Sequence, residues 1–141
     1  MLSLTQDLIK VGSRGFFDCI DLTTEVGAAI RRRGVAGGTA TVYVKGSTVG
    51  LTLLRSDEGT VQDFKEFLQG LFPQDRVYHH QRVTGDDNGY AHLLSGLLGQ
   101  TLSVPVVDGE LLIGANQGIF LLDFDNRASE RTVVIHVVAA G

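Results

Sequence analysis

Residues 101–113 read Thr-Leu-Ser-Val-Pro-Val-Val-Asp-Gly-Glu-Leu-Leu-Ile, and this stretch decides the fold class. Its Asp108-Gly109 dipeptide is a strong signal for a hairpin turn between two strands. The turn joins a strand at 101–107 to another at 110–113. Strands that follow one another through tight turns imply mostly antiparallel pairing.

Further strands are predicted from β-branched or alternating runs outside this hairpin. These runs are residues 2–10, 39–45, 49–54, 76–80, 117–124 and 131–139. The run at 131–139 is apolar at nearly every position, so both faces of that strand should be covered.

Three helices are expected between the strands. The first follows capping oxygens at 21–25 and ends at Gly34, the second carries an apolar stripe from Val61 to Leu71 before Pro73, and the third runs over 92–98. The order β-α-β-β-α-β-α-β-β-β predicts one α+β domain over residues 1–141, with a mostly antiparallel sheet.

Composition narrows the function classes. A chain of 141 residues fits one domain, and its net charge of −4 gives no overall attraction to nucleic acid or anionic lipid. The basic cluster Arg31–Arg33 is more typical of a helix end than of a DNA-binding surface. No signal peptide or membrane span is expected. The single cysteine, Cys19, suits a reducing compartment such as the cytoplasm, and we interpret it as a small core residue rather than a nucleophile.

The four histidines are the first candidates for chemistry. Tyr78 and His80 should share one face of a strand, whereas His136 lies in the apolar final strand and is typical of a core or interface residue. His92 falls in the first turn of a predicted helix, whose positive end favours a neutral imidazole suited to a metal ligand or a general base. The competing interpretation is that Asp87 and Asn88 only cap this helix and His92 is a surface neighbour.

Metal and anion sites have weaker signals. Two histidines do not make a zinc site, and Asp87 is the third candidate ligand only if it is not a helix cap. The segments 46–48 and 114–118 combine glycines with hydroxyl or amide donors, which suits an anion or a phosphate.

The order of these pieces along the chain resembles the YjbQ-like family, also called secondary thiamine-phosphate synthases. The matching pieces are Ser13–Phe16, Ser47-Thr48, Leu51–Leu53, Thr60–Asp63, Tyr78-x-His80, Asp87–His92, Leu98-Gly99, Pro105-Val106, Gly109, Gly114, Gln117-Gly118 and Arg131. The resemblance implies a compact α+β subunit and a homotrimer. It also implies a polar pocket of three histidines that takes a metal or an anion, and a side activity that joins a pyrimidine diphosphate to a thiazole phosphate.

Several family residues are replaced in this chain. Gly46 stands where the family has the first histidine of its His-Thr-Thr motif, and Leu54-Arg55 stands where it has Asn-Glu. The Gly-Thr-Trp-Gln motif lacks its tryptophan at 114–117. The matches that remain are His80, Asp87, Asn88, His92 and Gln117.

Three functional hypotheses follow. The favoured one is a partly degenerate site that binds a small anionic or phosphate-bearing ligand; the alternatives are a weak phosphate-handling transferase and a non-catalytic structural or interaction subunit. His80 and His92 are the candidate acid-base residues, and the candidate ligand-binding residues are Ser47, Thr48, Asp87, Asn88, Gln117 and Arg131. We expect Ser47-Thr48, His80, His92 and Gln117 to converge at one end of the sheet. We also expect a homotrimer without tightly bound zinc, and the sequence leaves any cofactor unidentified.

Overall fold

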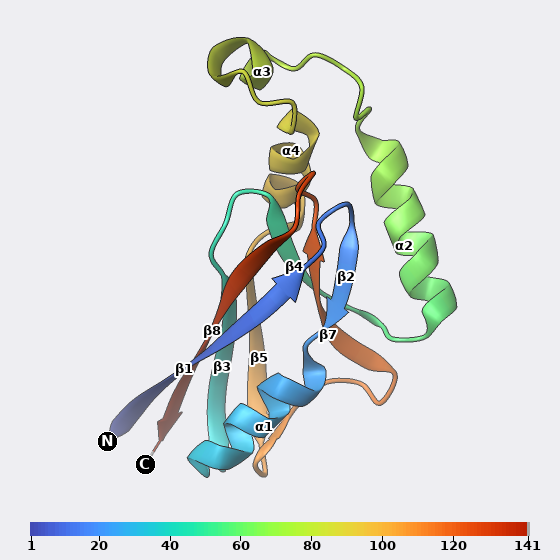
Figure 1. Cartoon of the computed structure of the whole chain (residues 1–141). Coiled ribbons are helices and arrows are strands. Elements are labelled where there is room, and N and C mark those ends of the chain that lie inside the picture. Colours follow the sequence, from blue (N-terminus) through green and yellow to red (C-terminus); the bar gives the residue numbers. More distant parts are fainter. Residues whose placement is uncertain (141) are drawn as a thin grey trace.

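The computed structural model describes residues 1–140, with the backbone alone at Ala140, so Gly141 of the predicted domain lies outside the described residues. The elements are β1 Leu2–Ser13, β2 Asp18–Asp21, α1 Thr23–Arg33, β3 Gly37–Val44, β4 Val49–Arg55, α2 Glu58–Leu71, α3 His79–Thr84, α4 Gly89–Leu98, β5 Thr101–Val107, β6 Glu110–Leu111, β7 Gln117–Asp123 and β8 Ser129–Ala140 (Figure 1). The predicted α+β class is confirmed.

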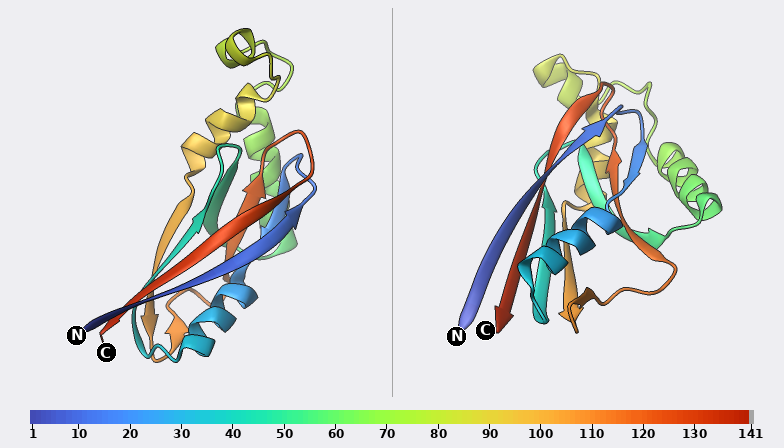
Figure 2. Two further views of the ribbon diagram at one scale, coloured as in Figure 1. Left: turned by 60° about the vertical axis from the view of Figure 1, so that its left-hand side comes forward. Right: turned by 60° about the horizontal axis from the view of Figure 1, so that its bottom comes forward.

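The strands form two antiparallel sheets. One has the order β1-β8-β3-β5-β6 and the other β2-β7-β4. The predicted hairpin is confirmed: Val107 pairs with Glu110, and the two turn residues have positive φ, 51° at Asp108 and 80° at Gly109. Figure 2 shows how β1 and β8 run together as a long twisted ribbon along one side of the molecule.

The core lies on both faces of the three-stranded sheet. One face, together with α1, covers the inner face of the five-stranded sheet through residues such as Val26, Leu51, Leu121 and Ile135. The other face packs against α2 and α4 around an aromatic cluster of Phe17, Tyr90, Phe120 and Phe124, with Leu68 from α2. The three-stranded sheet is therefore the middle layer, and it brings the end of β7 close to the start of α4.

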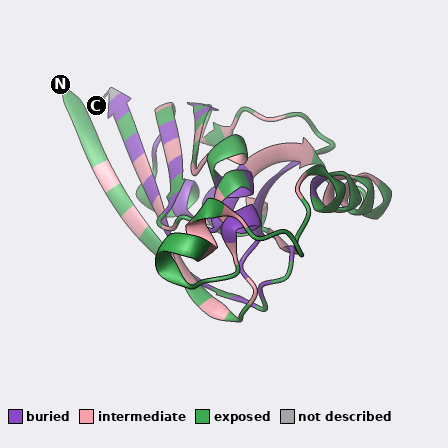
Figure 3. Ribbon diagram, turned by 90° about the horizontal axis from the view of Figure 1, so that it is seen from above, coloured by how far each residue is buried: buried purple, intermediate pink, exposed green. Residues whose placement is uncertain are grey.

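The outer face of the five-stranded sheet is exposed in the single chain. Its exposed apolar side chains include Leu2, Leu4 and Leu8 of β1, Tyr43 of β3, Val107 of β5 and Val138 of β8. Figure 3 shows most of β1 as exposed. Residues 133, 135, 137 and 139 are buried on the inner face. One chain thus covers one face of the last strand, not the two faces predicted, and a second covered face would require an assembly.

Two segments differ from the predicted elements. Residues 76–80 do not form a strand, and neither sheet includes them. Residues 79–84 instead form a short helix, α3, which is followed by Gly85 in the left-handed conformation. A short strand that was not predicted, β2, pairs with β7. The described residues hold four helices, and α4 begins at Gly89 rather than at His92.

The arginines that end α1 form ion pairs within the chain. Arg33 lies 3.0 Å from Asp7 of β1, and Arg31 lies 3.4 Å from Glu110 of β6. These contacts agree with the interpretation of Arg31–Arg33 as a helix end. Within residues 1–140, none of the helices combines the length and the apolar run that crossing a bilayer requires.

Candidate functional site

His80 and His92 lie against each other where α3 meets α4. Their ring centroids are 4.4 Å apart and the ring planes are inclined by 71°. His80 is the second residue of α3 and His92 the fourth of α4, so the pair is formed by two helices and not by a strand. The predicted shared strand face of Tyr78 and His80 is therefore wrong, whereas the two histidines are brought within reach of one ligand.

A main-chain hydrogen bond orients the ring of His92. Its Nδ1 lies 2.8 Å from the carbonyl oxygen of Ser47, which precedes β4. A carbonyl can only accept, so Nδ1 carries the proton and the neutral ring keeps its lone pair on Nε2. His92 is thus held in a tautomer whose unprotonated Nε2 suits a general base.

A cavity of about 320 Å³ opens beside this pair. Its lining residues are Arg76, Tyr78, His79, His80, Gly89, His92 and Leu93. The guanidinium of Arg76 lies 5.0 Å above the centre of the Tyr78 ring. Gly89 allows the close contact with Tyr78, because a Cβ at position 89 would lie 2.8 Å from the Tyr78 Cβ. No carboxylate is among these described lining residues.

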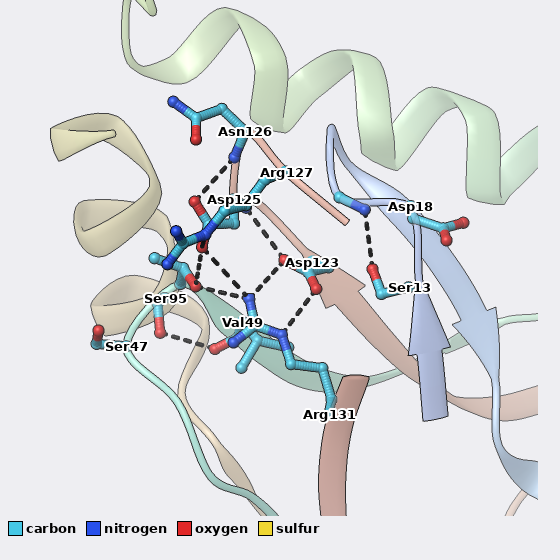
Figure 4. Close-up of polar contacts among 12 residues, drawn as sticks. Ser13, Asp18, Ser47, Val49, Ser95, Asp123, Asp125, Asn126, Arg127 and Arg131 are labelled. Atoms are coloured by element: carbon cyan, nitrogen blue, oxygen red, sulfur yellow. Dashed lines mark hydrogen bonds and ion pairs between the residues drawn. The ribbon is translucent and has the colours of Figure 1, made fainter. Parts of the chain in front are cut away.

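Behind the histidines, a buried ion pair joins the end of β7 to the start of β8. Arg131 donates two hydrogen bonds of 2.7 Å to the carboxylate of Asp123, which is fully buried (Figure 4). Its Nη2 also donates to the Thr48 hydroxyl at 2.7 Å. The hydrogen bond to Asp123 raises the pKa of Arg131 above its ordinary value. The predicted ligand-binding residues Arg131 and Thr48 are thus already engaged with each other.

Asp125 extends this network to the start of α4. Its carboxylate accepts from the Thr48 hydroxyl at 3.2 Å and from the Asn88 amide at 3.2 Å. Burial alone would raise the pKa of Asp125, but hydrogen bonds from Asn88, from the Asn126 backbone and from Thr48 hold it below its usual range. Asn88 is the N-cap residue of α4 but makes no side-chain capping bond, so the cap predicted for this position is replaced by a bond to Asp125.

The backbone of the same loop supports a strained turn between β1 and β2. Phe16 and Phe17 have positive φ of 53° and 67°, which is costly for residues with a side chain. Their N–H groups donate to the carbonyls of Asp125 at 2.7 Å and Asp123 at 2.8 Å. The end of β7 and the loop after it therefore bind three separate segments: the β1–β2 turn, the residues before β4 and the residue before α4.

A smaller cavity lies at the start of α4, next to Asn88. Its volume is about 130 Å³, and its lining residues are Asp86, Asp87, Asn88, Asp125, Asn126 and Arg127. Asp87 accepts a hydrogen bond of 2.7 Å from the Asn126 amide. The predicted residues Asp87 and Asn88 therefore face a carboxylate-rich cavity, in contrast to His80 and His92.

Gln117 does not join the other predicted site residues within the chain. It pairs with Arg55 at one end of the β4–β7 ladder, whereas Asp123 pairs with Val49 at the other. Six residues of strand separate the two ends by about 20 Å. The Gln117 side chain accepts from the Gly114 N–H at 2.7 Å. Of the residues expected to converge, the structure brings together His80 and His92, with the Ser47 carbonyl on the His92 ring, whereas the Thr48 side chain contacts Arg131 and Asp125.

The residues present do not fit the three-histidine metal pocket that the family resemblance implies. Among residues 1–140, no three His, Cys, Asp or Glu side chains lie close enough together to hold a metal ion. Gly46 has φ +154°, and a Cβ there would lie 2.8 Å from Val49 Cγ1 and 3.0 Å from Arg131 Nη1. A histidine at this position would need a local rearrangement.

The remaining candidates lie away from the cavity. Cys19 is partly buried in β2, and burial raises the pKa of its thiol to about 11, so little reactive thiolate is present near neutral pH. His136 lies on the outer face of β8, with its Nε2 2.7 Å from the Gln6 side-chain oxygen. Neither residue contributes to the His80–His92 cavity.

Three residues important to the site were missed in the sequence. Asp123 and Asp125 flank Phe124 at the end of an apolar strand, and carboxylates in such a run require a buried partner, which Arg131 supplies. That pattern could have identified the network. Arg76 carried no comparable signal, since an isolated arginine before an expected strand is usually solvated.

Comparisons with known proteins identify the family of this chain. The model of the family described as UPF0047 protein YjbQ-like matches residues 7–140. The chain belongs to the YjbQ-like family. A family member from Archaeoglobus fulgidus is 34% identical over 117 residues, which is 83% of this chain and 89% of that protein. One from Methanothermobacter thermautotrophicus is 31% identical over 137 residues, which is 97% of this chain and 92% of that protein.

Solved structures of the YjbQ-like family have the same fold. A Sulfolobus solfataricus protein described as YbjQ-like and of unknown function aligns with a TM-score of 0.93 and 26% identity, covering 99% of this chain and all of that one. A YjbQ/UPF0047 protein from Clostridium acetobutylicum aligns with a TM-score of 0.84 and 26% identity, covering 93% of this chain and 98% of that one. The family of this chain and its fold are thus both established.

Proposed function

We propose that this protein binds a small anionic or phosphate-bearing ligand in the His80–His92 cavity. The observation that carries the proposal is the chemistry of the cavity wall. Arg76 and three histidines line a space of about 320 Å³ without a carboxylate among them. Arginine and protonated imidazole are both good partners for phosphate oxygens.

Binding is favoured over metal-dependent turnover by the residues that are missing. Gly46 supplies no side-chain ligand, and His80 and His92 by themselves fall short of the three protein ligands of a catalytic zinc site. Asp87, the other candidate ligand, lines the smaller cavity instead.

The test is a titration with inorganic phosphate and pyrophosphate, followed by calorimetry and by histidine NMR signals. We expect saturable binding, because an arginine and several ring nitrogens line the cavity. His80→Ala and His92→Ala should each weaken binding about tenfold or more. His136→Ala is the matched control, since that histidine lies on the outer sheet face. Equal affinity in all three variants would contradict the proposal.

A weak transferase activity is the second candidate, and the orientation of His92 favours it. A neutral imidazole with its lone pair on Nε2 beside an anion-binding cavity is suited to general base catalysis. The assay offers a pyrimidine diphosphate and a thiazole phosphate to the purified protein. Turnover that disappears in His92→Ala would support this candidate, and phosphate binding without turnover would support binding alone.

We further propose that the protein works as a homotrimer in the cytoplasm. Exposed apolar residues on the outer sheet face, among them Leu4, Leu8 and Val138, form a surface suited to self-association. The same surface would serve if the chain is a structural or interaction subunit. Light scattering should report a trimer, and Leu8→Glu should dissociate it. A monomer at micromolar concentration would contradict the assembly.

A further inference from the structure

We infer that Asp125 is the positioning residue that fixes the ring of His92 in the tautomer with Nε2 unprotonated. This inference rests on the proposed function, since it takes the His80–His92 cavity as the ligand site. Asp125 touches neither histidine. It acts through the two segments that carry the His92–Ser47 hydrogen bond, because its carboxylate binds one residue of each.

The carboxylate of Asp125 is placed centrally and is only 6% exposed. One oxygen accepts from the Thr48 hydroxyl at 3.2 Å and lies 3.8 Å from the Arg131 guanidinium and 3.9 Å from that of Arg127. The other oxygen accepts from the Asn88 amide at 3.2 Å and from the Asn126 backbone N–H at 2.9 Å. Both carboxylate oxygens thus accept hydrogen bonds from neighbouring parts of the chain.

Each side of the histidine bond depends on one of these contacts. Thr48 directly follows Ser47, and its carbonyl also accepts from the Phe124 N–H at 2.8 Å, so the peptide that presents the Ser47 carbonyl is held on both sides. Asn88 directly precedes α4, which carries His92 in its first turn. Because Asn88 makes no capping bond within its helix, its bond to Asp125 holds the start of α4.

The consequence is chemical. A solvated neutral imidazole more often carries its proton on Nε2, which would remove the lone pair from that nitrogen. The hydrogen bond from Nδ1 to the Ser47 carbonyl selects the other form. A residue that maintains the 2.8 Å distance therefore controls whether Nε2 of His92 is a hydrogen-bond acceptor or a donor.

The experiment reads the tautomer directly, from long-range proton–nitrogen correlations of protein labelled with ¹⁵N at histidine, at pH 8 and without ligand. The wild-type signal of His92 should show a protonated Nδ1 and a bare Nε2. In Asp125→Ala the Nε2–H form should become the major one. Asp7→Ala is the matched control: it removes a carboxylate that also pairs with an arginine, on the remote strand β1, and should leave the His92 signal unchanged.

Two milder variants keep the proposal testable if Asp125→Ala does not fold. Thr48→Val and Asn88→Ala each remove one tether and retain the carboxylate, and each should shift part of the His92 population to the Nε2–H form. A His92 signal that keeps the wild-type tautomer in every folded variant would overturn the inference.

Phosphate titration of the same samples separates the two proposals. The titration of the wild type tests the proposed function, and the His92 tautomer in the variants tests the inference. A tautomer shift together with no phosphate binding by the wild type would refute the proposed function and leave the positioning role intact. Wild-type phosphate binding with no tautomer shift in the variants would do the opposite.

Discussion

The Asp123–Arg131 network and the His80–His92 cavity are neighbours, yet their polar groups are used in opposite ways. Arg131 is 11% exposed, and its guanidinium is engaged by Asp123, Thr48 and Asp125. Arg76, at the cavity, is exposed and lies over the ring of Tyr78. A polar group whose hydrogen bonds are satisfied inside the chain maintains shape, whereas one without an internal partner remains available to a ligand.

The largest expected effect comes from breaking the network at its buried end. Asp123→Ala would leave the Arg131 guanidinium largely buried without its bidentate partner, and we expect a loss of about 3–5 kcal/mol in the free energy of unfolding. Urea denaturation measures this. Asp18→Ala, which breaks the ion pair with the exposed Arg14, is the comparison, and its midpoint should move far less. Similar midpoints for the two variants would contradict the assigned role of the network.

Introducing a side chain at Gly46 should have the next largest effect on stability. Gly46→Ala combines an unfavourable φ of +154° with close approach to Val49 and Arg131, and Gly85→Ala has φ +83° with nothing within 4 Å of its Cβ. We expect Gly46→Ala to cost about 1–3 kcal/mol more than Gly85→Ala, because it alone overpacks the network. Thermal denaturation of the two variants gives the difference. For the same reason Gly46→His should not create a stoichiometric zinc site, which elemental analysis can check.

The third prediction concerns pH and the network's second carboxylate. The folded-state pKa of Asp125 is lowered, so the unfolded chain binds its proton more readily than the native chain. The resulting stabilisation is fully present above the unfolded pKa, near about 3.9, and is lost as the pH falls through the lower folded pKa. Asp125→Asn should therefore show a shallower loss of stability than the wild type over this acid range, measured by urea midpoints. An unchanged slope would refute the prediction.

The smallest effect on stability is expected at the cavity. Arg76→Ala should change the free energy of unfolding by no more than about 0.5 kcal/mol, since the side chain is exposed. It should nevertheless weaken phosphate binding about three- to tenfold, because a cation is removed from the ligand site. Arg82→Ala, a neighbouring exposed arginine of α3 outside the cavity lining, is the control and should leave the affinity unchanged.

The sequence was most informative where local chemistry alone sets the structure. The Asp108-Gly109 hairpin and the helix end at Gly34 were predictable because each needs only its own residues and a positive φ. The strand predicted at 76–80 was wrong, because β-branched and aromatic residues favour a strand only where a partner strand is present.

The candidate site divides in the same way. His80 and His92 were identifiable from residue type and from the resemblance, and the turn between α3 and α4 brings them together. The partners of Arg131 were not identifiable, because Thr48 and Asp123 reach it only after β4 and β7 have paired. Gln117 was expected nearby since it opens a strand, but antiparallel pairing places it at the opposite end from Asp123.

The β1–β8 ribbon has a consequence for how the chain folds. Its pairing runs from Leu2 with Ala140 to Ser13 with Ser129, so it joins segments that are more than a hundred residues apart. Such contacts close very large loops and are expected to form late and slowly, on a millisecond-to-second scale. Until then Leu4 and Leu8 lie on a strand without a neighbour, and during synthesis this first strand must wait for the ribosome to reach residue 140. We expect refolding yield to depend on protein concentration, because an unpaired strand of this length can associate with its copy in another molecule.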